Sequence, residues 1–401
     1  MSTFKYLFFM LSVISTVHHT VLSNKCTTPG NENAEKAYES AEVLQDLFYN
    51  ETSGLYVGYN STCNCTVNFW WNSANCITTL ADLLAIDHDA SSLVDPVFAN
   101  TFVRAQEYNL QMTKLGPMRS CYWTWRWNCP YEPPVEEPTG FLNNYYDDEG
   151  WWGLAWIAVY DLTGEEKYLK TAAFIFNDMA FTGYNGTCGA MYWDKSHSYQ
   201  NAITNELFLS LAAHLATRTA NGDYYLGWAL RQWTWFEGSG LINSQNLIND
   251  GLDNVTCENN GRATYTYNQG VILGGLVELN KASPNSTYLT IASSIAIAAI
   301  TKLSNVNGIL TEVNSNGSQD LGYDGPTFKG VFIRNLQLLQ QATGNENFRS
   351  YVLAQADSIW EKDRSLANGT LGNVWDMYYG QDLPQGHCAA MDAIVAALAV
   401  S

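Results

Sequence analysis

The sequence predicts an all-α protein whose twelve helices pair into a single-domain (α/α)6 toroid, a closed barrel of helical hairpins. First, twelve stretches repeat apolar residues every three or four positions, and no stretch alternates like a strand over more than a few residues. Second, these stretches form pairs that recur at intervals of roughly 55–65 residues, a longer period than that of open helical solenoids. Third, no linker rich in proline or serine divides the 401 residues.

The expected helices follow one another along the chain, with short and long loops in alternation. They cover residues 34–48, 72–86, 93–108, 148–163, 165–179, 201–217, 223–237, 265–280, 285–303, 327–343, 347–363 and 388–400. The segment 50–68 is rich in turn residues, so we expect a loop there. Segment 110–139 contains five prolines and several tryptophans, and loops of that length are usually functional.

Small residues indicate which helices lie inside the ring. Segments 153–156 and 270–275 are rich in alanine and glycine, which allows helices to crowd around a central axis. The long loops should then gather at one end of the ring and frame a cleft.

The N-terminus has the pattern of a secretory signal. Lys5 precedes an apolar stretch over residues 6–14, and Val21 and Ser23 fit the small residues before a cleavage site. We therefore expect a signal peptide at 1–23 and one folded domain at 24–401. We expect no integral membrane span, because the apolar stretch 291–300 is short and interrupted by serines. We expect the mature protein to be a secreted monomer that is either extracellular or associated with a cell wall.

Sequons and cysteines agree with secretion. Glycosylation is expected at the eight Asn-x-Ser/Thr sequons, which begin at Asn50, Asn60, Asn64, Asn185, Asn254, Asn285, Asn316 and Asn368. The chain also has nine cysteines, which suits an oxidising compartment. A Cys121–Cys129 disulfide would close a short loop, and Cys388, in an apolar alanine-rich segment, is expected to stay unpaired.

Charge and composition exclude several classes of ligand. The formal net charge of −19 argues against nucleic acid and against the polyanionic substrates of polysaccharide lyases. No Cys-x-x-Cys occurs, and the six histidines never pair at metal-ligand spacing. We therefore expect neither a metal nor another cofactor.

The segment 143–152 combines three consecutive acids with two tyrosines and two tryptophans. Sites that cleave sugars need both types, because carboxyl groups perform acid–base chemistry and flat aromatic faces stack on sugar rings. Asp147 and Asp148 are adjacent, with Cα atoms about 3.8 Å apart, which favours the short carboxyl separation of retaining glycosidases. Such closeness also raises one of the two pKa values. The alternative is that the acids only begin a helix, where its dipole favours them.

The residues 144–156 resemble the signature of glycoside hydrolase family 76, the endo-α-1,6-mannanases. Segments 189–193, 201–206, 265–270 and 324–332 resemble later blocks of that family, in the same order. The resemblance implies an (α/α)6 barrel, a catalytic domain over 24–401 and retention at the anomeric centre. It also implies that α-1,6-mannan, as polysaccharide or oligosaccharide, is the substrate.

The same resemblance assigns the catalytic roles. It implies that Asp147 is the nucleophile and that Asp148 is the acid/base. Glu149 stands where the family often has glutamine, and an acid there is expected to perturb the pKa of Asp148.

Further residues of these blocks and the nearby tryptophan loop are candidates for sugar binding. They are Asn143, Asn144, Tyr146, Trp151, Trp152, Asn201, Asn205, Tyr267, Asn268, Gln269, Asp324, Lys329 and Trp125. Each has a structural alternative. The asparagines can cap helices, one of the two adjacent tryptophans on a helix must face the core, and Trp125 can simply pack its loop.

Three readings of function remain open. The protein is a secreted mannanase, a cell-wall mannan transglycosidase of the same family, or a catalytically inactive mannan-binding protein on the same scaffold. Both aspartates are present, which counts against the third reading, and the absence of a lipid-anchor signal at 389–401 favours hydrolysis.

Overall fold

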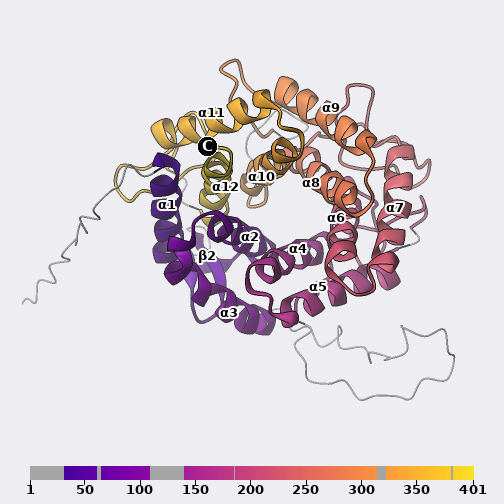
Figure 1. Ribbon diagram of the computed structural model, residues 1–401, viewed down its shortest axis with the longest axis horizontal. Coiled ribbons are helices and arrows are strands. Elements are labelled where there is room, and N and C mark those ends of the chain that lie inside the picture. The colour runs from indigo at the N-terminus through magenta and orange to yellow at the C-terminus, as the bar shows by residue number, and fades with distance from the viewer. Residues whose placement is uncertain (1–30, 61–64, 109–139, 185, 314–321, 381–382) are drawn as a thin grey trace, which may run out of the picture. The chain divides into compact units, whose positions relative to one another are not determined.

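Two concentric rings of helices make up the computed structural model of the chain (Figure 1). It describes residues 31–60, 65–108, 140–184, 186–313, 322–380 and 383–401, and residues 31–401 form one unit. Within the described residues there are twelve α-helices, which alternate between the outer and the inner ring. The predicted all-α toroid is therefore confirmed.

The outer ring consists of α1 (Glu32–Phe48), α3 (Ser91–Tyr108), α5 (Glu166–Asp178), α7 (Gly222–Gly238), α9 (Ser286–Leu303) and α11 (Glu346–Lys362). The inner ring consists of α2 (Trp70–Ile86), α4 (Tyr146–Thr163), α6 (Ala202–Arg218), α8 (Thr266–Ala282), α10 (Gly325–Thr343) and α12 (Pro384–Val400). Each inner helix packs on the next, and α12 packs on α2, which closes the ring.

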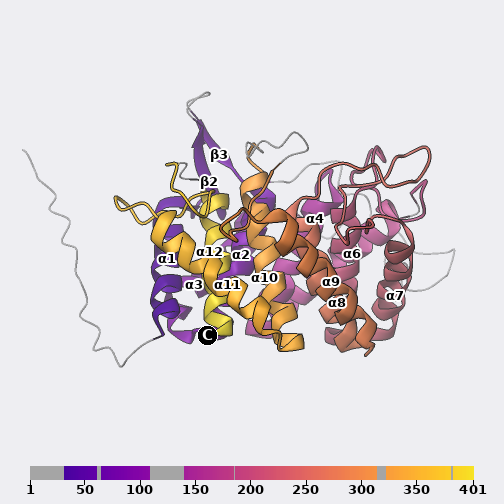
Figure 2. The same ribbon diagram turned by 90° about the horizontal axis from the view of Figure 1, so that it is seen from above.

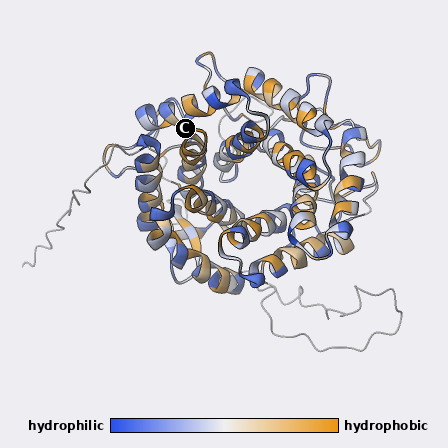
Figure 3. Cartoon of the chain, viewed as in Figure 1, coloured by the Kyte–Doolittle hydropathy of each residue, from blue (hydrophilic) through white to orange (hydrophobic). Residues whose placement is uncertain are grey.

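The two rings differ in burial because they face different surroundings. Outer helix α5 buries Tyr168, Leu169, Ala172, Ile175 and Phe176, which follow the helical period and leave a polar face outside. Inner helix α6 is packed on both sides and buries every residue from 202 to 213. Figure 3 shows hydrophilic and hydrophobic residues side by side around the outer ring. The main hydrophobic core therefore lies between the rings.

Two glycines allow neighbouring inner helices to pack closely, and one of them, Gly270, lies in a segment whose small residues predicted an inner helix. A Cβ on Gly270 of α8 would stand 2.6 Å from the Cα of Phe332 on α10, and one on Gly330 of α10 would stand 2.5 Å from the Cα of Ala389 on α12. Neither position can accept a larger residue without a shift of a neighbouring backbone.

A small sheet lies in the segment that we expected to be a loop. Strands β1 (Tyr49–Asn50), β2 (Leu55–Asn60) and β3 (Cys65–Asn68) pair antiparallel in the order β1-β2-β3. The prediction of a loop without strands was wrong here. The strands are too short to display alternation, and Gly58, which sits against Phe69, interrupts the longest. In Figure 2 the β2–β3 hairpin projects from the end of the ring that carries many of the loops.

Other expectations concern single segments. Helix α12 begins at Pro384, four residues before the predicted start, because proline is well suited to the first turn. Among the described residues, α9 alone is long and apolar enough to cross a membrane by length and composition, and it is an outer helix of the ring. Cys388 is unpaired, as predicted, and so is Cys76; both are buried.

Candidate active site

A cleft of about 680 Å³ opens where five of the inner helices begin. The first turns or N-caps of α2, α4, α6, α8 and α10 contribute to its lining. The lining residues are Trp71, Tyr145, Asp147, Asp148, Trp151, Trp193, Tyr199, Asn201, Asp250, Arg262, Tyr267, Asp324 and Phe328. Helix N-termini carry partial positive charge, so this end of the barrel suits the four carboxyl groups in the lining.

Asp147 and Asp148 lie in the first turn of α4, which begins at Tyr146. The backbone N–H of Asp148 donates to Oδ1 of Asp147 at 3.0 Å. The acids therefore occupy the first turn of a helix and also line the cleft, so the two interpretations of the sequence are both satisfied.

Asp147 is held by a second donor. The indole N–H of Trp193 donates to its Oδ2 at 2.9 Å. Burial raises the pKa of Asp147 to about 7, although these two hydrogen bonds lower it, and the charge of Asp324 raises it further. Asp147 thus changes its charge near neutral pH.

Asp148 is oriented by Asn143 from the preceding loop. The side-chain amide of Asn143 donates to Oδ2 of Asp148, and its Oδ1 accepts the backbone N–H of Tyr145 at 2.7 Å. Because Oδ1 is occupied by an N–H donor, the amide nitrogen must point at the carboxyl group.

Aromatic rings flank the two aspartates. Trp151 and Trp71 stack with ring centroids 5.9 Å apart, and the indole N–H of Trp71 donates to Asp324 at 2.9 Å. Tyr267 stacks on Phe328 at 3.9 Å. Flat apolar faces beside polar groups suit a ligand such as a sugar, which has an apolar face and a rim of hydroxyl groups.

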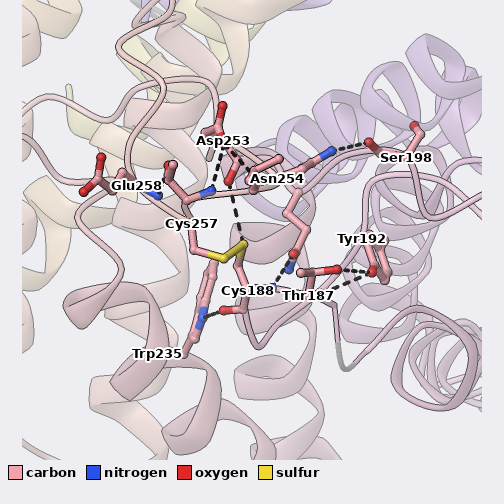
Figure 4. The surroundings of a disulfide bond; sticks show 12 residues. Thr187, Cys188, Tyr192, Ser198, Trp235, Asp253, Asn254, Cys257 and Glu258 are labelled. Carbon is pink, nitrogen blue, oxygen red and sulfur yellow. Dashed lines mark hydrogen bonds between the residues drawn. A yellow bond between two sulfur atoms is a disulfide. The ribbon is translucent and has the colours of Figure 1, made fainter.

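A further wall comes from two loops, residues 186–201 and 239–265. The hydroxyl of Tyr199 donates to Asp250 at 2.7 Å and accepts from the side-chain amide of Asn260 at 2.8 Å, and Arg262 lies over the Tyr199 ring at 5.6 Å. A disulfide between Cys188 and Cys257 joins the two loops (Figure 4).

Six of the predicted site residues line the cleft: Asp147, Asp148, Trp151, Asn201, Tyr267 and Asp324. Of the two adjacent tryptophans, only Trp151 lines the cleft. Trp152 is fully buried and packs on Trp70 and Trp156, so its prediction as a sugar-binding residue is corrected to a core position.

Three other predicted binding residues, Asn205, Gln269 and Lys329, do not belong to the lining of the cleft. Asn205 bonds the backbone of Met191, Gln269 bonds the backbone of Ile248, and Lys329 bonds the carbonyl of Asn373. These partners are backbone groups of loops, so the side chains fix loops that form the cleft. Asn143, Asn144, Tyr146 and Asn268 do not belong to the lining either, although Asn143 bonds Asp148.

Some predictions concern residues outside the described ranges or side chains that are not described. Trp125, Cys121 and Cys129, and the sequons at Asn64, Asn185 and Asn316, lie outside the described residues. Asn60 ends β2, and its side chain is not described. Asn254, Asn285 and Asn368 are exposed, whereas Asn50 is half-buried and accepts the backbone N–H of Ser53.

Sequence reasoning missed seven lining residues: Trp71, Tyr145, Trp193, Tyr199, Asp250, Arg262 and Phe328. A signal existed for Tyr145, Trp193 and Phe328, which lie within the segments that carried the family resemblance. Tyr199, Asp250 and Arg262 lie in loops without periodicity, where the sequence does not indicate which side chains converge. No group of three His, Cys, Asp or Glu side chains that could hold a metal occurs in the described part of the chain.

Comparison with known proteins gives concordant matches. The sequence model of Glycosyl hydrolase family 76 matches residues 32–400. The chain is 28% identical over 209 residues to mannan endo-1,6-alpha-mannosidase DCW1 of Candida albicans, covering 48% of this chain and 46% of that protein, so the match spans less than half of the relative. It is 23% identical over 375 residues to DFG5 of the same yeast, covering 87% of this chain and 77% of DFG5.

A solved structure shares the fold. It is an inactive variant of an α-1,6-mannanase from Salegentibacter in complex with α-1,6-mannotetrose, with a TM-score of 0.75 and 19% identity, covering 92% of this chain and all of the other. Two neighbouring carboxyl groups at a helix start, beside aromatic rings, form an arrangement that can cleave a glycosidic bond, with one group as the acid and the other as nucleophile or base.

Proposed function

The chain belongs to Glycosyl hydrolase family 76, and we propose that it is a secreted, retaining endo-α-1,6-mannanase. The observation that supports this most directly is the adjacent pair Asp147 and Asp148 on the cleft between the aromatic rings. The names of the curated relatives and the mannotetrose bound to a protein of the same fold support the substrate.

The proposed reaction has two steps. In the first, a carboxylate oxygen of Asp147 attacks the anomeric carbon, while Asp148 gives its proton to the leaving glycosidic oxygen. In the second, Asp148 takes a proton from water, and the resulting hydroxide oxygen displaces Asp147 from the sugar. The two inversions leave the anomeric configuration unchanged, and no cofactor takes part.

The geometry supports these roles. Asp147 accepts hydrogen bonds from Trp193 and from the backbone of Asp148, and such bonds stabilise the ionised form that a nucleophile needs. Trp71, Trp151, Tyr267 and Phe328 line the same cleft as the two aspartates, which supports a site that stacks aromatic rings on mannose.

We also propose that the protein acts outside the cell or at a cell wall, as a monomer of the domain 24–401 after loss of residues 1–23. The three exposed sequons Asn254, Asn285 and Asn368 are consistent with this route, because glycan attachment needs an accessible asparagine. Glycan mapping of the secreted protein, together with N-terminal sequencing, would test it.

Incubation of the purified protein with linear α-1,6-mannan tests the function. We expect short reducing oligosaccharides whose newly formed end is first the α-anomer by proton NMR, and a loss of at least about a thousandfold in Asp147→Asn. Products longer than the substrate would favour a transglycosidase. Binding without turnover would favour an inactive mannan-binding protein, and a β-anomer as first product would contradict retention.

A further inference from the structure

A buried ion pair lies directly behind the two aspartates. Glu149 follows the pair in sequence, and its side chain is fully buried. Its Oε1 accepts the backbone N–H of Asn143 at 2.7 Å and the ammonium group of Lys195 at 2.8 Å. Oε2 has no hydrogen-bond partner in the described structure. A carboxyl group so enclosed is costly in its charged form unless a cation compensates it, and Lys195 is that cation.

Lys195 connects the start of α4 to two other segments. Its ammonium group also lies 2.7 Å from Oδ2 of Asp178, the last residue of α5, and 5.4 Å from the ring centroid of Tyr146. Its backbone N–H donates to the carbonyl of Asn144 at 2.9 Å. One lysine thus fixes α5, the start of α4 and the loop that carries Trp193.

Asn143 transmits this arrangement to the cleft. Its backbone N–H bonds Glu149, while its side-chain amide donates to Oδ2 of Asp148. The position of Glu149 therefore sets the position of Asn143, and Asn143 orients the carboxyl group of Asp148. The chain of contacts runs from Lys195 through Glu149 and Asn143 to Asp148.

We propose that Lys195 is a positioning residue for Asp148, and that it acts by neutralising Glu149 so that Asn143 keeps its amide on the Asp148 carboxyl group. The proposal rests on the proposed role of Asp148 as acid/base. Burial raises the pKa of Glu149 well above its usual range, and Lys195 lowers it. Without Lys195, Glu149 is therefore protonated at lower pH and places an uncompensated charge one residue from Asp148 once the pH is high enough to ionise it. Because an amide cannot ionise, glutamine at 149 would remove the need for the lysine while still accepting the N–H of Asn143.

The test compares Lys195→Met, Glu149→Gln and the double variant. We expect Lys195→Met to lose on the order of a hundredfold in kcat on α-1,6-mannan, since small misplacements of catalytic groups have costs of that size, with little change in KM. The loss should grow as pH rises, because Glu149 then ionises among Asp148, Asp178 and Tyr146. The double variant should recover to within about threefold of Glu149→Gln, because the two changes act on one interaction.

Lys281→Met is the matched control. Lys281 also pairs with a buried glutamate, Glu278, at 2.5 Å, but it lies at the far end of α8, about 20 Å along the helix axis from Tyr267. Its kcat should stay at the level of the unmutated enzyme. Thermal unfolding of every variant shows whether a loss of activity reflects a loss of folding.

The results of this test distinguish a failure of the proposed role of Lys195 from a failure of the proposed mannanase activity. An active enzyme whose Lys195→Met variant is folded and equally active contradicts the proposal and leaves the function standing. Equal losses in Lys195→Met and in the double variant also contradict it, since removing the charge of Glu149 should restore activity. An unmutated enzyme that does not cleave α-1,6-mannan overturns the function and the proposal together.

Discussion

The indole nitrogen of Trp193 lies 2.9 Å from Oδ2 of Asp147 and donates a hydrogen bond to it. The two residues are 46 positions apart, and a second bond joins their segments, from the backbone N–H of Tyr146 to the carbonyl of Trp193 at 2.9 Å. The proposed nucleophile is therefore oriented by the loop that follows α5 in the sequence. The hydrogen bond to Tyr146 holds this loop beside the start of α4.

Trp193→Phe should weaken catalysis by lowering the ionised fraction of Asp147. The ring remains, but the hydrogen bond to the carboxylate is lost, and a bond to a charged group contributes about 1.5–3 kcal/mol. We expect a 10- to 100-fold lower kcat/KM at neutral pH, which is about the same free energy, and an acidic limb of the pH–rate profile shifted to higher pH. A profile that falls uniformly without a shift would mean that the indole N–H does not set the pKa of Asp147.

Replacement of the two aspartates should produce different defects. Asp148→Asn lacks the proton donor, so it should regain activity on aryl mannosides with good leaving groups, which depart without protonation. Asp147→Asn lacks the nucleophile and should stay inactive on both substrates. Initial rates on mannan and on a nitrophenyl mannoside measure the difference, and equal recovery of both variants would contradict the assigned roles.

The ring was predictable because the repeating apolar pattern reports burial directly. In outer helix α5, for example, the buried residues Leu169, Ala172 and Phe176 recur every three or four positions. The β2–β3 hairpin left no such signal, since strands of six and four residues are too short for a period to be visible.

The sequence predicted the part of the cleft that lies at the start of α4, but not the part that the loops 186–201 and 239–265 contribute. Asp147, Asp148 and Trp151 share one short segment, so sequence proximity alone brought them together. Asp250 and Tyr199 meet across 51 residues through contacts between two loops, and no local pattern encodes such a meeting. The sequence likewise could not show that Trp152 and Asn205 are buried instead of lining the cleft, because residues of inner helices are buried on nearly all sides.

The raised pKa of Asp147 should make the folded protein less stable at higher pH. The group has a pKa of about 7 when folded and about 3.9 in an unfolded chain, so the folded state binds more protons between these values and stability falls as pH rises through them. Asp147→Asn removes this effect. We expect its Tm to exceed that of the unmutated protein at pH 8 and to match it near pH 4.

Asp253→Asn serves as the control of opposite sign. Backbone N–H groups of Thr256 and Val255 lower the pKa of Asp253, so its ionised form favours folding above the unfolded pKa and that contribution is lost as pH falls. Its replacement should lower the Tm at pH 8. A Tm of Asp147→Asn that stays below that of the unmutated protein at pH 8 would contradict the assignment of a destabilising carboxyl group.

Removal of the Cys188–Cys257 disulfide should affect both stability and substrate binding. The bond closes a loop of 69 residues, for which chain entropy predicts a contribution of about 4 kcal/mol to the free energy of unfolding. It also joins the loop of Trp193 and Tyr199 to the loop of Asp250 and Arg262 (Figure 4). We therefore expect a lower Tm in the double Cys→Ser variant, and a KM for α-1,6-mannan that rises by more than kcat falls.

Other contacts between the same loops limit the size of this effect. The side-chain amide of Asn254 donates to the carbonyl of Ser198, and the backbone N–H of Leu252 donates to the carbonyl of Gln200 at 3.0 Å. Without the disulfide, the two loops should therefore become more mobile but stay in contact. Cys388→Ala, which removes an unpaired buried thiol, is the control and should leave KM unchanged. If the double Cys→Ser variant loses stability but keeps its KM, the disulfide stabilises the fold without positioning the cleft wall, and Tyr199 and Asp250 are held by their own hydrogen bonds alone.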